Sequence, residues 1–288
     1  MGSSFSSIGH SMTRRAVTAG GGTSQPWLPS DLNVRLWIDA DDSSSISLSG
    51  STIVGVTDKA SVHSFSIGGT PTIVTNGLNN RDVMDFSGSN EYVQSTTYNL
   101  SITGGNHFAI GVFRYDNVNA NGDSFWSIET NASAKRDYAM SAGTSSNTWP
   151  GEIDLDGLGT NQRISSTIGN VQQWNAIANL SRFTYYIVGC YFNKTGNQIG
   201  VRVDGTNAFT PVNDYDNALS PYQQLRLMRN RSSQELDGRV AEIFWINDIT
   251  GTSGTDMSYF EKAEGYLAHK WGLAGRLPSS HPYKSNAP

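Results

Sequence analysis

The chain has 288 residues, of which only 16% are charged, and its formal net charge is −5. Because its Lys and Arg residues are scattered and form no basic stripe, the composition disfavours a nucleic-acid-binding protein. The single cysteine, Cys190, excludes an intramolecular disulfide and a zinc site built from several thiolates. It lies in the apolar segment 183–192, so we expect a buried, unreactive thiol. No stretch approaches the roughly 18 consecutive apolar residues that a membrane-spanning helix needs.

The first 26 residues are dominated by Ser, Gly and Thr. Such a segment cannot bury enough apolar surface to fold alone, so we expect an extended N-terminal arm over 1–26 that orders against neighbouring subunits. One domain is expected over 27–288. Arg14 and Arg15 are not followed by an apolar segment, so no secretory signal peptide is expected.

From Trp27 onward, short segments rich in β-branched and aromatic residues are separated by turn pairs such as Asp204-Gly205. Several alternate in polarity, for example where Met84 and Phe86 share one face of a strand. Many short strands with almost no helix between them predict an all-β sandwich and exclude a parallel α/β fold. The predicted strands are 36–40, 52–57, 65–67, 72–75, 83–86, 92–96, 108–114, 124–128, 183–192, 199–203, 225–228 and 240–246.

Residues 131–180 are poorly patterned, and we expect long loops with short strands there. One helix is predicted near the end of the chain. Ser258 and Glu261 have the spacing of a capping box at its start, and Gly272 can end it in a left-handed conformation. The pattern indicates a short amphipathic helix that closes one edge of the sandwich, with an apolar face of Phe260, Ala263, Leu267 and Trp271.

Two parts of the chain carry a family resemblance. The first includes Leu36-Trp-Ile-Asp-Ala-Asp41 and Val83-Met-Asp-Phe-Ser-Gly88. The second runs from Leu236 to Ile246 and continues through Glu264-Gly-Tyr-Leu-Ala-His-Lys-Trp-Gly-Leu273 to Leu277-Pro-Ser-Ser-His-Pro-Tyr-Lys284. These segments resemble the concanavalin A-like, laminin-G-like jelly-roll domains that recur in bacteriophage virion proteins and bacterial surface proteins. The resemblance implies a jelly-roll β-sandwich whose first and last strands pair in one sheet.

The resemblance and the missing leader segment together favour a non-enzymatic virion structural protein of a bacteriophage: a capsid decoration, head-fibre or tail-associated subunit. We expect it to anchor to other virion proteins through residues 1–26 and to form a homo-oligomer, a trimer, with loops that can contact host surface glycans. No cofactor, nucleic acid or membrane is expected as a partner. The alternative is a carbohydrate-binding lectin module of a bacterial surface protein, located outside the cell or on its surface.

A second alternative is a glycoside hydrolase. The segment Glu152-Ile-Asp-Leu-Asp156 is similar to the Glu-x-Asp-x-Glu strand of laminarinase-type enzymes, which share the fold. Alternation along a strand would place Glu152, Asp154 and Asp156 on one face. Asp156 is one methylene shorter than the family's Glu, and Gly157 follows it, so we expect an acidic turn and assign no catalytic residue.

Three aspartates and five histidines are the remaining candidates for a metal site. Asp39, Asp41 and Asp42 follow a predicted strand, and calcium prefers such oxygen ligands, but their spacing is not that of an EF-hand. We expect a solvated turn there. The histidines show no metal-binding spacing, and no metal site is assigned.

Tryptophans in or beside loops are candidates for sugar stacking, because a flat indole packs well against an apolar face. Trp126, Trp149 and Trp174 occupy such positions, and Trp149 and Trp174 are selected as glycan-binding residues. Core positions in strands and in the helix are expected instead for Trp37, Trp245 and Trp271.

If the two loop tryptophans stack on sugar rings, Trp149→Ala and Trp174→Ala each weaken carbohydrate binding by roughly tenfold or more, in line with the loss of a large aromatic contact. Calorimetric titration with an oligosaccharide that binds the wild-type chain measures this. Unchanged affinity in both variants would remove these residues from the site.

Overall fold

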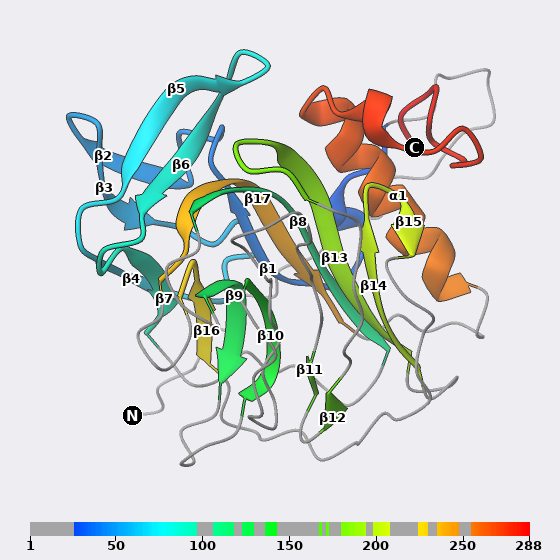
Figure 1. The fold of residues 1–288 in the computed structure, drawn as a ribbon, viewed down its shortest axis with the longest axis horizontal. Coiled ribbons are helices and arrows are strands. Elements are labelled where there is room, and N and C mark those ends of the chain that lie inside the picture. The colour runs from blue at the N-terminus through cyan, green and yellow to red at the C-terminus, as the bar shows by residue number, and fades with distance from the viewer. Residues whose placement is uncertain are drawn as a thin grey trace, which may run out of the picture.

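The strands pair into two antiparallel β-sheets in the computed structural model (Figure 1). The structure describes residues 26–96, 106–117, 123–129, 136–142, 167–168, 171–172, 180–193, 198–207, 224–229, 235–247 and 255–288.

Ten of the described strands form the larger sheet. Its order is β15 (Thr206–Asn207), β14 (Gln198–Val203), β13 (Tyr185–Asn193), β8 (His107–Asn117), β17 (Asp237–Ile246), β6 (Arg81–Ser87), β5 (Thr72–Leu78), β3 (Thr52–Val56) and β2 (Ile46–Ser49), and β1 (Val34–Asp39) pairs with β17.

Seven described strands form the second sheet, in the order β12 (Val171–Gln172), β11 (Thr167–Ile168), β10 (Arg136–Ala142), β9 (Asp123–Glu129), β16 (Gln224–Leu227), β7 (Tyr92–Ser95) and β4 (Phe65–Gly68).

Strand β17 organises the larger sheet. One of its edges pairs with β8, and the other pairs first with β6 and then with β1. The pairing of β1 with β17 confirms the prediction that the first and last strands meet in one sheet. The described ends of the chain also meet, because the Trp27 N–H donates a hydrogen bond to the Pro288 carbonyl (3.0 Å).

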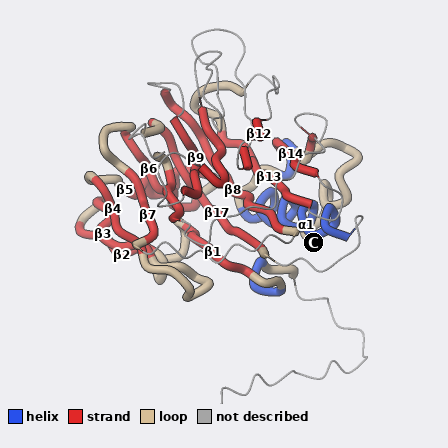
Figure 2. The backbone as a smooth tube through the Cα atoms, turned by 90° about the horizontal axis from the view of Figure 1, so that it is seen from below, coloured by secondary structure: helices blue, strands red, loops and turns tan. Residues whose placement is uncertain are grey.

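Two hydrophobic cores lie on opposite faces of the larger sheet. The inner core fills the space between the two sheets and includes Met84, Phe113, Trp126 and Trp245. The outer core lies between the larger sheet and the helix α1 (Thr255–Lys270), which contacts β8 and β13. In both Figure 1 and Figure 2 the helix lies beside the β13–β14 end of this sheet. The architecture is an all-β, concanavalin A-like jelly-roll sandwich with one C-terminal amphipathic helix.

The predicted strands are all present, and the predicted alternation places Met84 and Phe86 in the inner core. The opposite face of β6 is less exposed to solvent than the alternation predicts, because Val83 is buried in the outer core. Five strands without a strong apolar pattern were missed: β2, β10, β11, β12 and β15.

The helix buries the predicted face, since Phe260, Ala263, Leu267 and Trp271 are fully buried. Burial of side chains such as Phe260 and Leu267 contributes about 1.5–3 kcal/mol each. The prediction that the helix closes an edge of the sandwich was wrong, because this broad apolar stripe lies flat against the face of the sheet. Gly272 ends the helix at φ +68°, and the Leu273 N–H donates to the Ala268 carbonyl (2.7 Å), a Schellman closure.

No described helix has the length and apolarity needed to cross a membrane. Cys190 is fully buried in the inner core, and burial raises the pKa of its thiol well above the ordinary value. This position confirms the prediction of a buried thiol. Residues 1–25 lie outside the described residues, so the division into an arm and one domain stays a prediction.

A β-bulge at Ala241 decides which side of β17 carries its one glutamate. The register against β8 slips by one residue between Val240 and Glu242. Val240 lies in the inner core before the slip, and Ile243 lies there after it. Glu242 therefore points to the outer side of the sheet and not into the apolar space between the sheets.

The Glu242 carboxylate is fully buried and accepts four hydrogen bonds. Its Oε1 accepts from Trp37 Nε1 (2.7 Å) and the Tyr266 hydroxyl (3.0 Å), and its Oε2 accepts from Trp271 Nε1 (2.8 Å) and Lys270 Nζ (2.7 Å). Four donors occupy the four acceptor positions of an ionised carboxylate. Burial raises the pKa of Glu242, and the ammonium of Lys270 opposes that shift.

A second carboxylate lies on the neighbouring strand β1, directly opposite Glu242. Asp39 is the register partner of Glu242 in the β1–β17 pair, and like charges in that position repel. Lys270 lies between them, with its Nζ 2.7 Å from Asp39 Oδ2 and 2.7 Å from Glu242 Oε2. This lysine comes from α1, so the ion cluster ties the helix to both strands.

Removing the buried charge should be far more damaging than removing an exposed one. Glu242→Gln leaves Lys270 and three neutral donors facing an amide, and breaking a buried ion pair costs about 3–5 kcal/mol. Asp85→Asn is the matched control, because its carboxylate pairs with Arg239 (2.5 Å) at a partly exposed position, where such pairs contribute under about 1 kcal/mol. Urea unfolding measures both. Equal losses in the two variants would contradict the role given to Glu242.

Candidate functional site

A tight hairpin at one end of the larger sheet forms one wall of the candidate site. Asp204 and Gly205 connect β14 to β15 with φ angles of +49° and +80°, as a two-residue hairpin turn requires. The sequence predicted this turn correctly. The Asp204 carboxylate accepts hydrogen bonds from the Ile187 N–H (2.9 Å) and Arg276 Nε (2.7 Å), which hold the turn against β13 and the C-terminal segment.

The C-terminal segment approaches the hairpin closely at Gly205. A Cβ atom on this residue would lie 2.9 Å from Pro278 Cδ and 3.0 Å from His281 Cδ2. Position 205 therefore requires glycine for two reasons: its positive φ angle and its close contact with the C-terminal segment. This approach brings residues 278–281 beside β14 and β15.

A buried ion pair connects the hairpin to the helix. Arg202, on β14, donates from Nε to Glu264 Oε1 (2.8 Å) and from Nη2 to Glu264 Oε2 (2.9 Å). Arg202 Nη2 also donates to the Gly205 carbonyl (2.7 Å), and Nη1 lies 3.4 Å from Asn207 Oδ1. His281 Nε2 lies 3.1 Å from Glu264 Oε2, so strand, helix and C-terminal segment all meet at one carboxylate.

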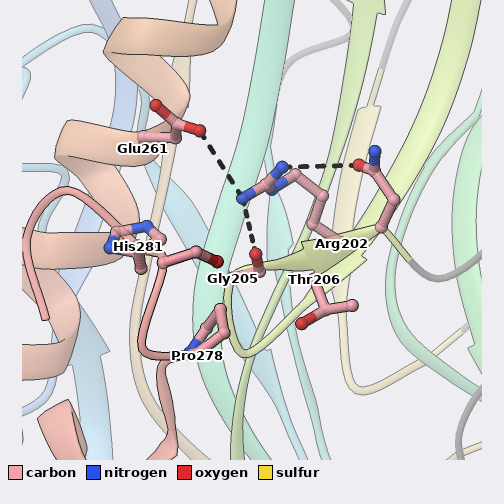
Figure 3. A pocket seen from close by; sticks show the side chains of 8 residues that line it. Arg202, Gly205, Thr206, Glu261, Pro278 and His281 are labelled. Carbon is pink, nitrogen blue, oxygen red and sulfur yellow. Dashed lines mark hydrogen bonds and ion pairs between the residues drawn. The ribbon is translucent and has the colours of Figure 1, made fainter.

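These three elements enclose a pocket of about 460 Å³, here called the hairpin pocket. Figure 3 shows the Arg202 guanidinium between Glu261 on the helix and Gly205 on the hairpin. The volume is within the range of small-molecule sites, roughly 300–1,000 Å³. The pocket is lined by Arg202, Gly205, Thr206, Asn207, Glu261, Pro278, Ser280 and His281.

The outer part of the hairpin pocket carries polar groups with unused hydrogen-bonding capacity. Within the described part of the chain, the hydroxyls of Thr206 and Ser280 make no hydrogen bond, and the Asn207 side chain makes only the long contact with Arg202. The Glu261 carboxylate lies 4.0 Å from Arg202 Nη2 and makes no other side-chain contact among these residues. Exposed hydroxyl, amide and carboxylate groups therefore surround a buried guanidinium, an arrangement that can hydrogen-bond a polyhydroxylated ligand.

The sequence assigned Glu261 a different role, and that assignment was wrong. A capping box requires the helix to begin near Ser258, but α1 begins at Thr255 and places Glu261 in its second turn. A carboxylate at that position cannot reach the first-turn N–H groups that a capping box satisfies. It lines the pocket instead.

The three clustered aspartates each have basic or backbone partners. Asp39 binds Lys59 (2.9 Å) and Lys270, and Asp41 pairs with Arg81. A hydrogen bond from Lys59 and two from Ser44 hold the pKa of the Asp42 carboxyl well below its usual value. Asp39 is 3% exposed, so the expectation of a solvated turn was wrong for this residue, whose carboxylate is held by Lys59 and by Lys270 of the helix. Among the described residues, no group of three His, Cys, Asp or Glu side chains is arranged to hold a metal ion.

The tryptophan expectations were partly correct. Trp37, Trp245 and Trp271 are core residues as predicted. Trp126 is not an exposed stacking residue, because a bulge at Phe125 in β9 turns both aromatic rings into the inner core.

The other predicted site residues lie outside the described residues: Trp149, Trp174, Glu152, Asp154 and Asp156. An exposed aromatic that the sequence did not single out is Phe183, which is 65% exposed. The guanidinium carbons of Arg114 and Arg182 lie 5.9 and 5.7 Å from its ring centre, so cations already occupy its surroundings.

The sequence missed the pocket because its members come from three distant segments. Arg202 was visible as a charge inside an apolar strand, which is a signal for a buried partner. Glu264 and His281 both fell in the segments that carry the family resemblance, but no spacing rule joins them to a strand 62 residues before Glu264.

No protein-family model and no curated protein sequence matches the chain. Solved structures do share its fold. Domain 4 of AbnA, a GH43 extracellular arabinanase from Geobacillus stearothermophilus, solved in complex with arabinotriose, superposes with a TM-score of 0.51 at 10% identity. The match covers 75% of this chain and 93% of that domain.

A sialidase from Trypanosoma rangeli in complex with sialic acid gives a TM-score of 0.53 at 12% identity. The match covers 89% of this chain but only 35% of the sialidase, so the chain spans about a third of that protein. At these identities the likeness shows a shared β-sandwich fold.

Proposed function

We propose that this chain is a carbohydrate-binding module and that the hairpin pocket is its binding site. The observation that carries the proposal is the set of unused hydrogen-bonding groups around the pocket, from Thr206, Asn207, Ser280 and Glu261. Sugars bind through several hydroxyl groups at once, so they need donors and acceptors that protein partners have not already taken.

The pocket is also well suited to hold those groups in place. Arg202 is 7% exposed, and its bidentate pair with Glu264 fixes the guanidinium at the base of the pocket. The outer residues are attached to a tight hairpin, a helix and a segment packed against both. A preorganised site loses less entropy when a ligand binds.

The fold gives a precedent. Domain 4 of the arabinanase matches over nearly its whole length and was crystallised with arabinotriose, so this architecture can bind a neutral oligosaccharide without being the whole enzyme. Fold likeness alone does not assign a function. It supports the proposal by agreeing with the chemistry of the pocket.

The contacts in the pocket favour binding over hydrolysis. A retaining glycosidase needs two carboxyl groups about 5 Å apart, with both available to the substrate. Here both oxygens of Glu264 are bound by Arg202, and one also faces His281. Glu261 is then the carboxylate that faces the pocket, and a single carboxylate cannot serve as both nucleophile and acid.

This proposal takes up the lectin-like alternative from the sequence. The virion role, the trimer and the anchoring to other virion proteins through residues 1–26 stay predictions.

Removing one hydroxyl from the pocket tests the proposal. Thr206→Val keeps the shape and strand propensity of the residue but deletes one hydrogen bond, which contributes about 1 kcal/mol, or roughly fivefold in affinity. Calorimetric titration with neutral oligosaccharides, arabinotriose among them, measures the effect. Thr52→Val is the matched control, because it makes the same change in β3 near the opposite end of the sheet.

The control should bind as the wild type does. The proposal fails if no oligosaccharide binds the wild-type chain at millimolar concentration, or if the two valine variants have the same affinity.

A further inference from the structure

The charges around the hairpin pocket do not balance. Among the described residues, Arg202 is the cation that lines the pocket, and Glu264 already neutralises it through two hydrogen bonds of 2.8 and 2.9 Å. Glu261 adds a second carboxylate 4.0 Å from the same guanidinium. Two carboxylates and one guanidinium leave a net charge of −1 at the pocket.

His281 does not restore the balance. Its Nδ1 accepts a hydrogen bond from the Tyr283 N–H (3.2 Å), so that nitrogen carries no proton. Its Nε2, 3.1 Å from Glu264 Oε2, must then be the donor. The imidazole is therefore the neutral Nε2–H form in this arrangement.

The neighbouring cations are also occupied. Arg276 pairs with Asp204 at 2.7 Å, on the far side of the hairpin turn. Lys284 donates to three backbone carbonyls, those of Ala274 (2.9 Å), Gly275 (2.7 Å) and Leu277 (2.6 Å). Neither cation lines the pocket, and both are held by their own acceptors.

We infer, on the basis of the proposed function, that the hairpin pocket selects neutral and amino sugars and rejects sugars that carry a carboxylate, such as uronic acids. An acidic sugar would bring a further negative charge next to Glu261, and among the described residues that line the pocket no free guanidinium or ammonium can receive it. An ammonium group on a sugar would instead meet the carboxylate of Glu261, whose guanidinium neighbour at 4.0 Å is already neutralised by Glu264. The discrimination therefore depends on one residue that is partly exposed and not needed to hold the Arg202–Glu264 pair.

Three ligands with the same ring test this inference: methyl glucoside, methyl glucuronide and glucosamine. We expect the glucuronide to bind the wild-type chain roughly tenfold more weakly than the glucoside, and glucosamine to bind at least as tightly as the glucoside. Saturation-transfer and chemical-shift titrations at low millimolar concentration measure the three dissociation constants in one buffer of about 0.15 M ionic strength.

Glu261→Gln should narrow the ratio between glucuronide and glucoside to within about threefold, because it removes the uncompensated charge. Asp42→Asn is the charge-matched control. It also removes one negative charge, but the Asp42 carboxylate lies in the loop after β1 and pairs with Lys59. The ratio between glucuronide and glucoside affinity should therefore stay as in the wild type.

The outcomes separate the two proposals. If none of the three sugars and no neutral oligosaccharide binds, the proposed function fails, and the charge selection fails with it. If the glucoside binds but the glucuronide binds equally well, or if Glu261→Gln leaves the ratio unchanged, the pocket still binds sugars and only the charge selection is overturned.

Discussion

Lys270 bridges two buried carboxylates that face each other across the β1–β17 pair, and with Lys59 it balances their charge while it ties the helix to the sheet. Without the ammonium, Asp39 and Glu242 would repel at a position where both are almost fully buried. Because Lys270 is the last residue of α1, its ion pair with Glu242 requires the helix to lie against the sheet. The indole N–H of Trp271 also donates to the Glu242 carboxylate, just before the Schellman closure that ends the helix.

A second ion pair, between Arg202 and Glu264, positions the rest of the helix against the sheet. Lys270 holds the C-terminal end of α1 near the centre of the sheet, and Glu264 holds its middle to Arg202 on β14. Two charged contacts along one helix fix its direction as well as its distance from the sheet. The direction brings Glu261 over the β14–β15 hairpin, and the C-terminal segment then returns to close the pocket beside Gly205. The binding site is thus a consequence of how the helix is docked.

Much of this fold could be predicted from local patterns. Alternation identified the inner face of β6 at Met84 and Phe86, and the Asp204-Gly205 pair identified the hairpin turn. Local patterns could not show the bulge at Ala241, because Val240 to Ile246 is apolar on both faces apart from Glu242. They could not join Trp37 to Glu242 either, since 205 residues separate these partners. Glu261 was misassigned because its spacing from Ser258 matches a capping box that the longer helix makes impossible.

Mapping of backbone amide chemical shifts tests most directly whether a sugar binds in the hairpin pocket. A neutral oligosaccharide titrated into the ¹⁵N-labelled chain should shift the amides of Gly205, Thr206, Asn207, Ser280 and His281 most strongly, while those of β2 and β3 stay unmoved. Binding that leaves these five amides in place and shifts others, such as those of Trp149 and Trp174, would contradict binding in that pocket.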